Sequence, residues 1–287
     1  MKVIDVPRAG FDRHHGDPHS NAARRAVIGL SLTVGFGLAV SGCSSSGGPP
    51  TPQSTQSTQS TQSTHSTPSS ASVLAPLHGS YSPSIDPADF VQTIDNRYWP
   101  LLPGTGYRYA GVRGSTRQLD DEVVLHSTKQ ILGVTCTVVR DTVSEGGRPV
   151  ERTFDWYAQD RQGNVWYMGE ESLELKNGHM VKASDSWESG VNGAKPGIIM
   201  PGSPRPGDAY RQEYYPPGEA LDQARVLRLD GSLTVPYGAF RHVLVTSERS
   251  PLEPQTEQKY YAPGLGEVAE RVVKGHHEEF QLVRVTH

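Results

Sequence analysis

The sequence predicts an all-β protein: one antiparallel sheet that curves strongly or closes into a partly open β-barrel, preceded by a short N-terminal helix. Two observations predict this class. Runs of β-branched and aromatic residues alternate with polar residues, and clusters of Gly, Asn and Asp recur between the runs. Closely spaced strands are joined by hairpins, so a sandwich, barrel or curved sheet is the natural packing.

The first expected element is a short helix, because Asp86 is a favourable N-cap and Pro87 follows at the first helical position. The apolar alternation then predicts strands that include residues 119–125, 134–138 and 241–245. Turn signals separate the expected strands at residues 145–147, 162–164, 176–178 and 230–231.

Two stretches of the chain are similar to each other. In residues 131–165 and again in residues 235–268, a glycine turn opens an apolar strand, and an aromatic strand ending in Tyr-Ala leads through a glycine-bearing turn into another strand. Two interpretations stay open: an old duplication of one β unit, or coincidence in a turn-rich β protein.

The N-terminal segment predicts export. Arg24 and Arg25 precede an apolar run over residues 26–40, which is too short to span a bilayer comfortably, and Ser41 and Gly42 lead into Cys43. This order resembles the bacterial lipobox, which implies a signal peptide at residues 1–42, diacylglycerol on the Cys43 sulfur, and acylation of the new amino terminus by a chain such as palmitate. The alternatives are an ordinary secretory signal or an uncleaved anchor.

A tether is expected over residues 43–82. No Asp, Glu, Lys or Arg occurs between residues 44 and 82, and Gln-Ser-Thr repeats fill residues 53–64, so this segment cannot bury a core. A coil of about 40 residues spans roughly 35 Å, enough to hold a domain clear of a membrane. The single globular domain is expected at residues 83–287.

Charge and cysteine content narrow the class of protein. The chain carries 27 Lys and Arg against 31 Asp and Glu; residues 1–42 hold five of the former and three of the latter, which leaves a mature net charge of about −6. A mildly acidic chain offers no basic patch for binding nucleic acid or anionic lipid. Cys43 and Cys136 are the two cysteines, so lipidation of Cys43 precludes an intramolecular disulfide, and we expect Cys136 in the core.

Several short sequence segments are similar to those of a widespread family of uncharacterised bacterial secreted proteins and lipoproteins. They lie at residues 154–160, 163–167, 196–201, 210–215 and 260–264. The resemblance covers roughly residues 95–285. Because that family has no established activity, the resemblance implies neither a catalytic set nor a binding set.

Four sets of residues offer chemistry, and each has a structural interpretation that we prefer. The pattern G-x-G-x-x-A at residues 264–269 follows Pro263 and indicates a hairpin turn rather than a dinucleotide site. The acids at residues 120–122 suit a charged edge better than a cation site. His276 and His277 lack zinc-site spacing. We therefore expect no metal and no cofactor.

The fourth set is acidic. Asp155, Asp160, Glu170 and Glu171 flank an aromatic hairpin and could form a carboxylate pair for acid/base work. Asp160 precedes Gly163, as a turn acid does, while Glu170 and Glu171 are typical of a solvated strand end. The sequence thus favours a non-enzymatic protein, with a hydrolase using Asp155 or Glu170 as the third hypothesis.

The leading hypothesis rests on apolar residues. Residues 193–207 form a Pro/Gly-rich segment that carries Ile198, Ile199 and Met200, and long loops of this kind tend to cover binding sites. We expect these three side chains to act as a lid over the open end of the sheet. The protein would then be an extracytoplasmic, membrane-anchored lipoprotein that binds an apolar or amphipathic ligand, or an envelope partner. The alternative is a purely structural or protein-interaction module.

Overall fold

A computed structural model of the chain describes residues 70–287. The bounds of its elements are α1 (Ser70–Leu74), η1 (Pro87–Asp89), β1 (Phe90–Val91), β2 (Ile94–Asn96), β3 (Trp99–Leu101), β4 (Gly106–Arg113), β5 (Thr116–Ile131), β6 (Val134–Glu145), β7 (Arg148–Asp160), β8 (Val165–Lys176), β9 (His179–Lys182), β10 (Trp187–Glu188), β11 (Lys195–Met200), β12 (Ala209–Arg211), β13 (Glu213–Tyr214), η2 (Pro216–Gly218), β14 (Gln223–Val235), β15 (Gly238–Arg249), β16 (Thr256–Ala262), β17 (Gly266–Lys274) and β18 (Glu278–Thr286). Within these residues α1 is the only α-helix.

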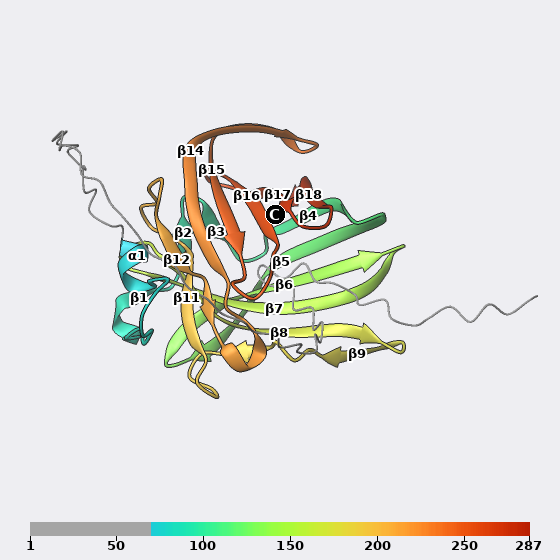
Figure 1. Ribbon diagram of the computed structural model, residues 1–287. Helices are drawn as coiled ribbons and strands as arrows, with labels where there is room; N and C mark the ends of the chain where they lie inside the picture. The colour runs from blue at the N-terminus through green and yellow to red at the C-terminus, as the bar shows by residue number, and fades with distance from the viewer. Residues whose placement is uncertain (1–69) are drawn as a thin grey trace, which may run out of the picture.

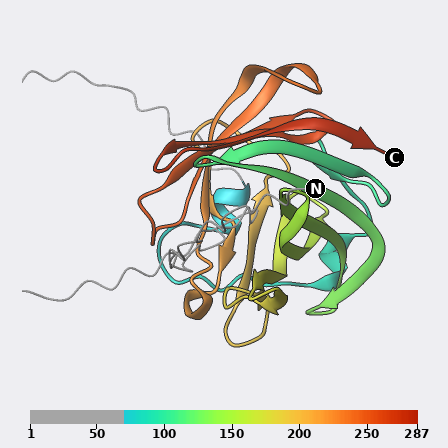
Figure 2. The same ribbon diagram turned by 90° about the vertical axis from the view of Figure 1, so that its right-hand side faces the viewer.

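The strands form one antiparallel sheet that rolls into a nearly closed barrel, as the sequence predicts. Its strand order is β12-β14-β15-β16-β17-β18-β4-β5-β6-β7-β8-β11-β13. Figures 1 and 2 show the long strands β4 to β8 curving round toward the C-terminal strands, so that C-terminal β18 lies beside β4. Because eight of the twelve neighbouring pairs in this order are also consecutive in the chain, hairpins build most of the barrel.

The barrel has one seam, where the strand order begins and ends. The terminal strands β12 and β13 are consecutive in the chain, with only Gln212 between them. Residues 71–85, which we name the N-terminal strap, lie along this seam. Arg211 donates its backbone N–H to the Ala75 carbonyl at 2.8 Å on one side, and on the other the Tyr81 hydroxyl donates to the carbonyl of Pro196. The strap therefore satisfies backbone groups that a sheet edge would otherwise expose.

A hairpin of two short strands, β2 and β3, closes one end of the barrel; we call it the plug. Trp99 of β3 is 8% exposed and packs against Tyr157 of β7 and Tyr261 of β16, with ring centroids 5.7 Å away in both cases. Ile94 and Leu101 join the same apolar cluster as the inward side chains of the long strands. The plug is thus part of the barrel core, and the aromatic contacts fix its position.

A second apolar cluster lies on the outer face of β6, β7 and β8. The strap residues Ala71, Ala75 and Tyr81 pack there with Cys136 and Trp156. Cys136 is completely buried, as the sequence predicts, and burial raises the pKa of its thiol to about 12, so it stays protonated and unreactive at neutral pH.

Most of the expected local structure is confirmed. The Asp86 side chain accepts a hydrogen bond from the Ala88 N–H at 2.9 Å and caps the single turn η1. The three expected strands lie in β5, β6 and β15. The turn expected at residues 230–231 is wrong: Gly231 lies inside β14, where the register to β15 shifts, so the glycine marks a β-bulge.

Two other expectations are corrected. The packed chain extends N-terminal to residue 83, because α1 and the rest of the strap contact the barrel; the tether residues 43–69 lie outside the described part. The segment expected to be an irregular lid is strand β11 over residues 195–200, although Pro196 and Gly197 resemble a loop. Gly197 packs so closely on the Gln212 backbone that an added Cβ would approach it to 2.3 Å.

The two similar stretches of sequence form similar structures. Strands β6, β7 and β8 make one antiparallel meander, and strands β15, β16 and β17 make another. Tyr157 and Tyr261, which correspond in the two stretches, contact the same Trp99.

Trp99→Ala should lower the free energy of unfolding by about 3–5 kcal/mol, because it empties the space between two buried tyrosines. Chemical denaturation with tyrosine fluorescence and circular dichroism measures the change. Leu102→Ala is the matched control: Leu102 is 50% exposed just beyond β3, and its loss should cost less than about 1 kcal/mol. An equal loss of unfolding free energy in the two variants would show that the Trp99 contacts do not stabilise the barrel core.

Candidate functional site

The inner face of the barrel changes from apolar to acidic along each long strand. On β7, inward-facing Tyr157 is two residues from buried Asp155, and on β16 Tyr261 is two residues from buried Lys259. Residues two apart on a strand share one face. The same order recurs in Val124 and Glu122 on β5, Val139 and Asp141 on β6, Val268 and Glu270 on β17, and Phe280 and Glu278 on β18.

The strand pairing puts all these acids toward the same end of the barrel. Glu278 pairs with Arg113, and Glu248 pairs with Glu257, next to the turns that join their strands. We call this end of the barrel, opposite the plug, the acidic rim. The inward side chains near the plug form the apolar zone, and those near the acidic rim form the acidic zone. The barrel interior is therefore amphipathic along its axis.

Asp155 and Glu170 form the centre of the acidic zone on β7 and β8. The two residues are direct cross-strand partners, and the Tyr167 hydroxyl lies between them, 2.6 Å from Asp155 Oδ1 and 3.1 Å from Glu170 Oε2. One hydroxyl proton can be donated to only one carboxylate, so the second contact requires a proton on a carboxyl group. Burial, together with the Glu170 charge, accordingly raises the pKa of Asp155 well above its usual value.

This pair does not have the form of an open acid/base site. Both carboxylates are buried, and the tyrosine hydroxyl occupies the position between them. The sequence predicts Glu170 at a solvated strand end, and this is wrong. Gly169, with φ of 142°, forms a bulge opposite Trp156, and the bulge turns Glu170 inward beside Asp155.

Tyr157 carries a buried hydroxyl at the boundary of the two zones. Its ring stacks on Tyr167 with centroids 4.9 Å apart, and the residue is 1% exposed. No hydrogen-bond partner accompanies its hydroxyl within the described part of the chain. Burial raises the pKa of this hydroxyl, and the nearby charges of Asp155 and Glu122 raise it further. A buried donor without a partner costs about 1–3 kcal/mol unless a ligand satisfies it.

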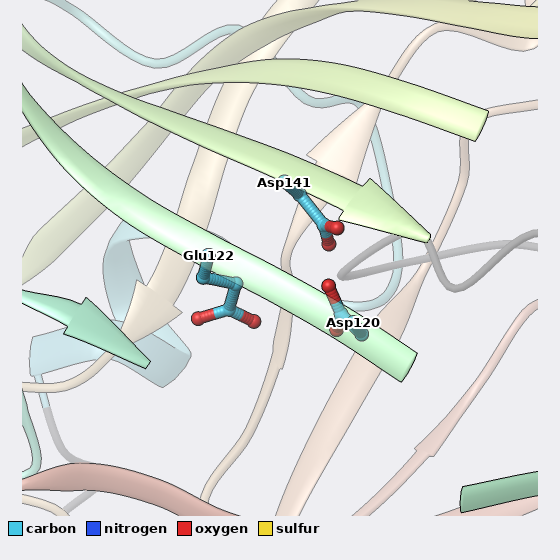
Figure 3. Close-up of side chains that lie close together, drawn as sticks. All are labelled: Asp120, Glu122 and Asp141. Atoms are coloured by element: carbon cyan, nitrogen blue, oxygen red, sulfur yellow. The ribbon is translucent and has the colours of Figure 1, made fainter. Parts of the chain in front are cut away.

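Three further acids lie together on β5 and β6. One carboxylate oxygen from each of Asp120, Glu122 and Asp141 lies within 4.8 Å of the other two. Figure 3 shows Asp120 and Asp141 pointing toward each other from neighbouring strands. This spacing suits oxygen atoms around one positive charge. Asp120 is completely buried, which corrects the prediction of an exposed charged edge at residues 120–122.

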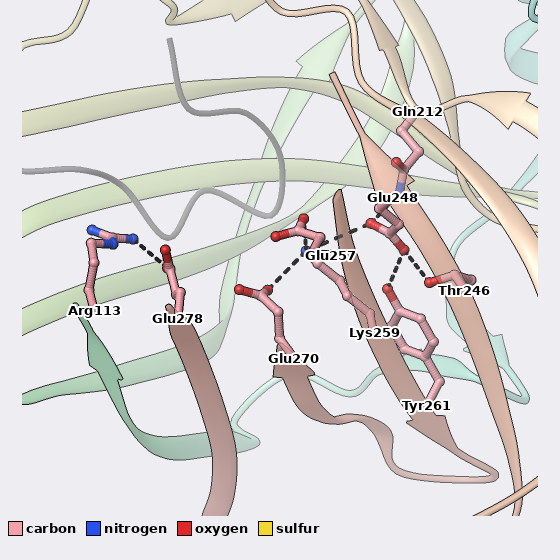
Figure 4. Close-up of polar contacts among 9 residues, drawn as sticks. All are labelled: Arg113, Gln212, Thr246, Glu248, Glu257, Lys259, Tyr261, Glu270 and Glu278. Carbon is pink, nitrogen blue, oxygen red and sulfur yellow. Dashed lines mark hydrogen bonds and ion pairs between the residues drawn. The ribbon is translucent and has the colours of Figure 1, made fainter. Parts of the chain in front are cut away.

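The opposite wall of the acidic zone is built around Lys259. Its ammonium lies 3.2 Å from Glu270 Oε2 and 3.8 Å from oxygens of Glu257 and Glu248 (Figure 4). Burial alone lowers the pKa of Lys259, but the surrounding carboxylates raise it to a net value well above normal. Lys259 is therefore charged, and among the fully buried charged side chains of residues 70–287 it is the only cation.

Glu248 is held by four groups. Its two oxygens accept hydrogen bonds from the Thr246 hydroxyl at 2.6 Å, the Tyr261 hydroxyl at 2.9 Å and the Gln212 amide at 3.0 Å, and Lys259 supplies the charge. Because Gln212 lies at the seam, this network joins the acidic zone to the closure of the barrel (Figure 4).

Two buried acids complete the zone near the seam. Glu213 Oε1 accepts a long hydrogen bond of 3.4 Å from the Asp222 N–H. Burial raises the pKa of both side chains well above normal; Asp222 and Glu170 raise that of Glu213 further. Raised carboxyl pKa values are expected here, because a buried carboxyl group that keeps its proton avoids an uncompensated negative charge.

The remaining sequence candidates have structural roles. Asp160 accepts hydrogen bonds from the Gln162 and Asn164 N–H groups and from the Trp166 indole, as expected for a turn acid. Gly264 lies in the turn between β16 and β17, so the hairpin predicted for residues 264–269 is confirmed. The His276 ring is 3.2 Å from Glu278.

The expected lid residues lie inside the protein rather than over its opening. Ile198, Ile199 and Met200 are all buried in β11. Ile199 and Met200 belong to the apolar cluster inside the barrel, whereas Ile198 belongs to the outer cluster beneath the strap. Ile198 and Ile199 alternate between the two cores, and a bulge between Ile198 and Met200 puts Met200 on the same side as Ile199.

Comparisons with known proteins find similarity in structure only. No family model matches the chain, and no curated protein matches it. Two crystal structures resemble it, each with a TM-score of 0.39 and covering 67% of this chain. One is a predicted exported protein with a YmcC-like fold from Bacteroides fragilis, at 12% identity and over 100% of that chain. The other is a predicted lipoprotein from Parabacteroides distasonis, at 11% identity and over 99% of that chain.

Within residues 70–287, the one α-helix is far shorter than a membrane crossing requires.

The raised pKa values predict the sign of a pH effect. The folded protein holds protons on Asp155, Glu213 and Asp222 at pH values where the unfolded chain, with ordinary pKa values of 3.8 for Asp and 4.5 for Glu, has lost them. The free energy of unfolding should therefore fall as pH rises above about 5, by up to about 1.4 kcal/mol per pH unit for each proton. Urea denaturation between about pH 5 and 8 measures the slope.

Asp155→Asn removes one of these proton-binding groups, so the unfolding free energy should fall less steeply with pH. Asp121→Asn is the control, because Asp121 is a half-exposed partner of Arg108 on the outer face of β5 and its loss should leave the slope unchanged. A slope in Asp155→Asn equal to that of the unchanged protein would contradict the assignment.

Proposed function

We propose that this chain is a lipid-anchored protein of the bacterial cell envelope. The lipobox-like order before Cys43 supports the anchor, and the uncharged Gln-Ser-Thr repeats support a tether that holds the barrel away from the membrane. Cys43 lies outside the described residues. Two or more acyl chains are needed for firm attachment, at about 0.8 kcal/mol for each buried methylene.

We further propose that the barrel binds an amphipathic ligand that combines an apolar body with a cationic group. The observation that carries this proposal is the division of one interior into an apolar zone and an acidic zone. The Tyr157 hydroxyl, 1% exposed and without a partner among the described residues, supports it independently because it lies where the two zones meet. Aromatic rings beside carboxylates are common surroundings for organic cations.

Binding would place each part of the ligand against matching chemistry. The apolar body would contact Tyr157 and Tyr167 and approach Ile199 and Met200, which face the same interior. The cationic group would meet the carboxylates of Asp155 and its neighbours and displace a proton from them. Because the acidic zone is buried, the ligand would enter as the hairpin turns at the acidic rim move apart. The binding site would then lie in the interior rather than beneath the expected lid.

Cys43→Ala should abolish lipid attachment. Mass spectrometry of the N-terminal peptide should find diacylglycerol on Cys43 in the unchanged protein and an unmodified, uncleaved leader in the variant. Cys136→Ala is the matched control, because it removes the other cysteine from a buried strand and should leave the lipid in place. A leader that is removed normally from Cys43→Ala would support an ordinary secretory signal instead.

The ligand class is tested with three eight-carbon probes that share one chain and differ in head group: octylammonium, octanol and octanoate. The protein is the mature chain with Ser in place of Cys43, so that no detergent is needed, and binding is followed by calorimetry and tryptophan fluorescence. Octylammonium should bind at least about tenfold more tightly than octanol, since a charge-assisted hydrogen bond contributes about 1.5–3 kcal/mol. Octanoate should bind most weakly.

The variant Asp155→Asn should reduce the preference for octylammonium over octanol, whereas Asp121→Asn on the outer face should leave it unchanged. Equal binding of the three probes would show non-specific partition into apolar surface. Tightest binding of octanoate would overturn the assignment of a cationic ligand.

A further inference from the structure

A small hollow opens at the acidic rim beside the seam, at a site separate from the Asp155 pair. It has a volume of about 30 Å³, room for a single ion or water, and lies between the start of β14 and the loop that joins β15 to β16. The oxygen-bearing side chains that line it are Asp222, Glu248, Ser250, Glu253, Gln255 and Glu257.

Asp222 supplies the observation that points to a ligand. Its side chain is 5% exposed and lines the hollow, and its Oδ1 atom has no hydrogen-bond partner among residues 70–287. A buried carboxyl oxygen without a partner costs free energy that a bound cation or water would recover, and a cation would displace the proton that burial holds on Asp222. Two hydrogen bonds hold the backbone of Asp222 in place, because its N–H donates to Glu213 and its carbonyl accepts from the Gln212 N–H.

The chemistry of the lining favours a hard cation. Its donors are carboxylate, hydroxyl and amide oxygens, with no sulfur or imidazole, and this set suits Ca²⁺ or Mg²⁺ rather than zinc or copper. Arg249 also borders the hollow, but it is exposed to solvent. The Lys259 ammonium lies 3.2 Å from Glu270 and 3.8 Å from Glu248 and Glu257, and its charge also acts on Asp222. One buried ammonium is thus shared among several carboxylates, so the lining keeps room for a second positive charge.

We propose that this hollow binds one Ca²⁺ ion. Ca²⁺ accepts irregular sets of side-chain oxygens from a flexible loop, whereas Mg²⁺ demands a near-ideal octahedron. The ion would join Asp222 at the start of β14 to the loop after β15, and so would brace the barrel next to its seam. Ca²⁺ binding here is independent of the ligand of the Asp155 pair and of the lipid anchor.

The test is a calorimetric titration of the full chain with CaCl₂ after chelation, in a buffer with excess KCl, and a thermal unfolding scan with and without Ca²⁺. The expected result is one site with a dissociation constant of about 10⁻⁴–10⁻³ M, the range of extracellular calcium modules, and a higher unfolding temperature with Ca²⁺. Asp222→Asn should weaken binding about tenfold or more.

Asp230→Asn is the matched control, since Asp230 is exposed on β14, away from the residues that line the hollow, and the variant should bind Ca²⁺ as the unchanged chain does. If Asp222→Asn fails to fold, Glu257→Gln, which changes another acid that lines the hollow, replaces it with the same expected loss. Absence of a Ca²⁺ signal from the unchanged chain would overturn the proposal and leave the hollow to water. Equal affinity in Asp222→Asn and Asp230→Asn would also overturn it, because the ion would then bind elsewhere.

Discussion

The contact of Trp99 with two tyrosines is the interaction on which the rest of the structure depends. Tyr157 and Tyr261 come from the two similar meanders, and Trp99 comes from the plug, so this one cluster ties three parts of the chain to a common centre. It also fixes where the apolar packing ends. From that level toward the opposite rim, the inward positions carry carboxylates. A continuous apolar core would need no such arrangement to be stable, which suggests a functional reason for it.

In the acidic zone, the cost of burying carboxylates is offset in two different ways. On the Lys259 wall, hydrogen bonds and an ammonium group keep Glu248 compatible with its charge. On the Asp155 wall, the Tyr167 hydroxyl and a bound proton do this instead. The sheet gives these groups a rigid frame, because β7 and β16, which carry Asp155 and Lys259, are each hydrogen-bonded to a strand on both sides.

Strand alternation made much of this fold predictable, and it also carried information about the site. Asp155 is in phase with Tyr157, and Lys259 with Tyr261, so the alternation that placed the tyrosines inside also placed the charged residues inside. Charged residues usually face solvent, however, so these charged side chains are not expected inside the barrel from the sequence alone. Glu170 could not be found from alternation, because the bulge at Gly169 changes the phase. Strand β11 was hidden because Pro196 and Gly197 resemble a loop, and only the close approach of the Gln212 backbone explains the glycine.

The position of the N-terminal strap has a mechanical consequence. A pulling force applied from the N-terminal side would reach residues 71–85 before any long strand, and these residues hold the seam through a few contacts, such as those of the Arg211 guanidinium with the carbonyls of Pro76 and Leu77. Contacts of this kind peel one after another, whereas the long ladders of the barrel would have to shear together. A barrel pulled from its N-terminal side would therefore loosen first at Gln212, where the two edges of the sheet meet.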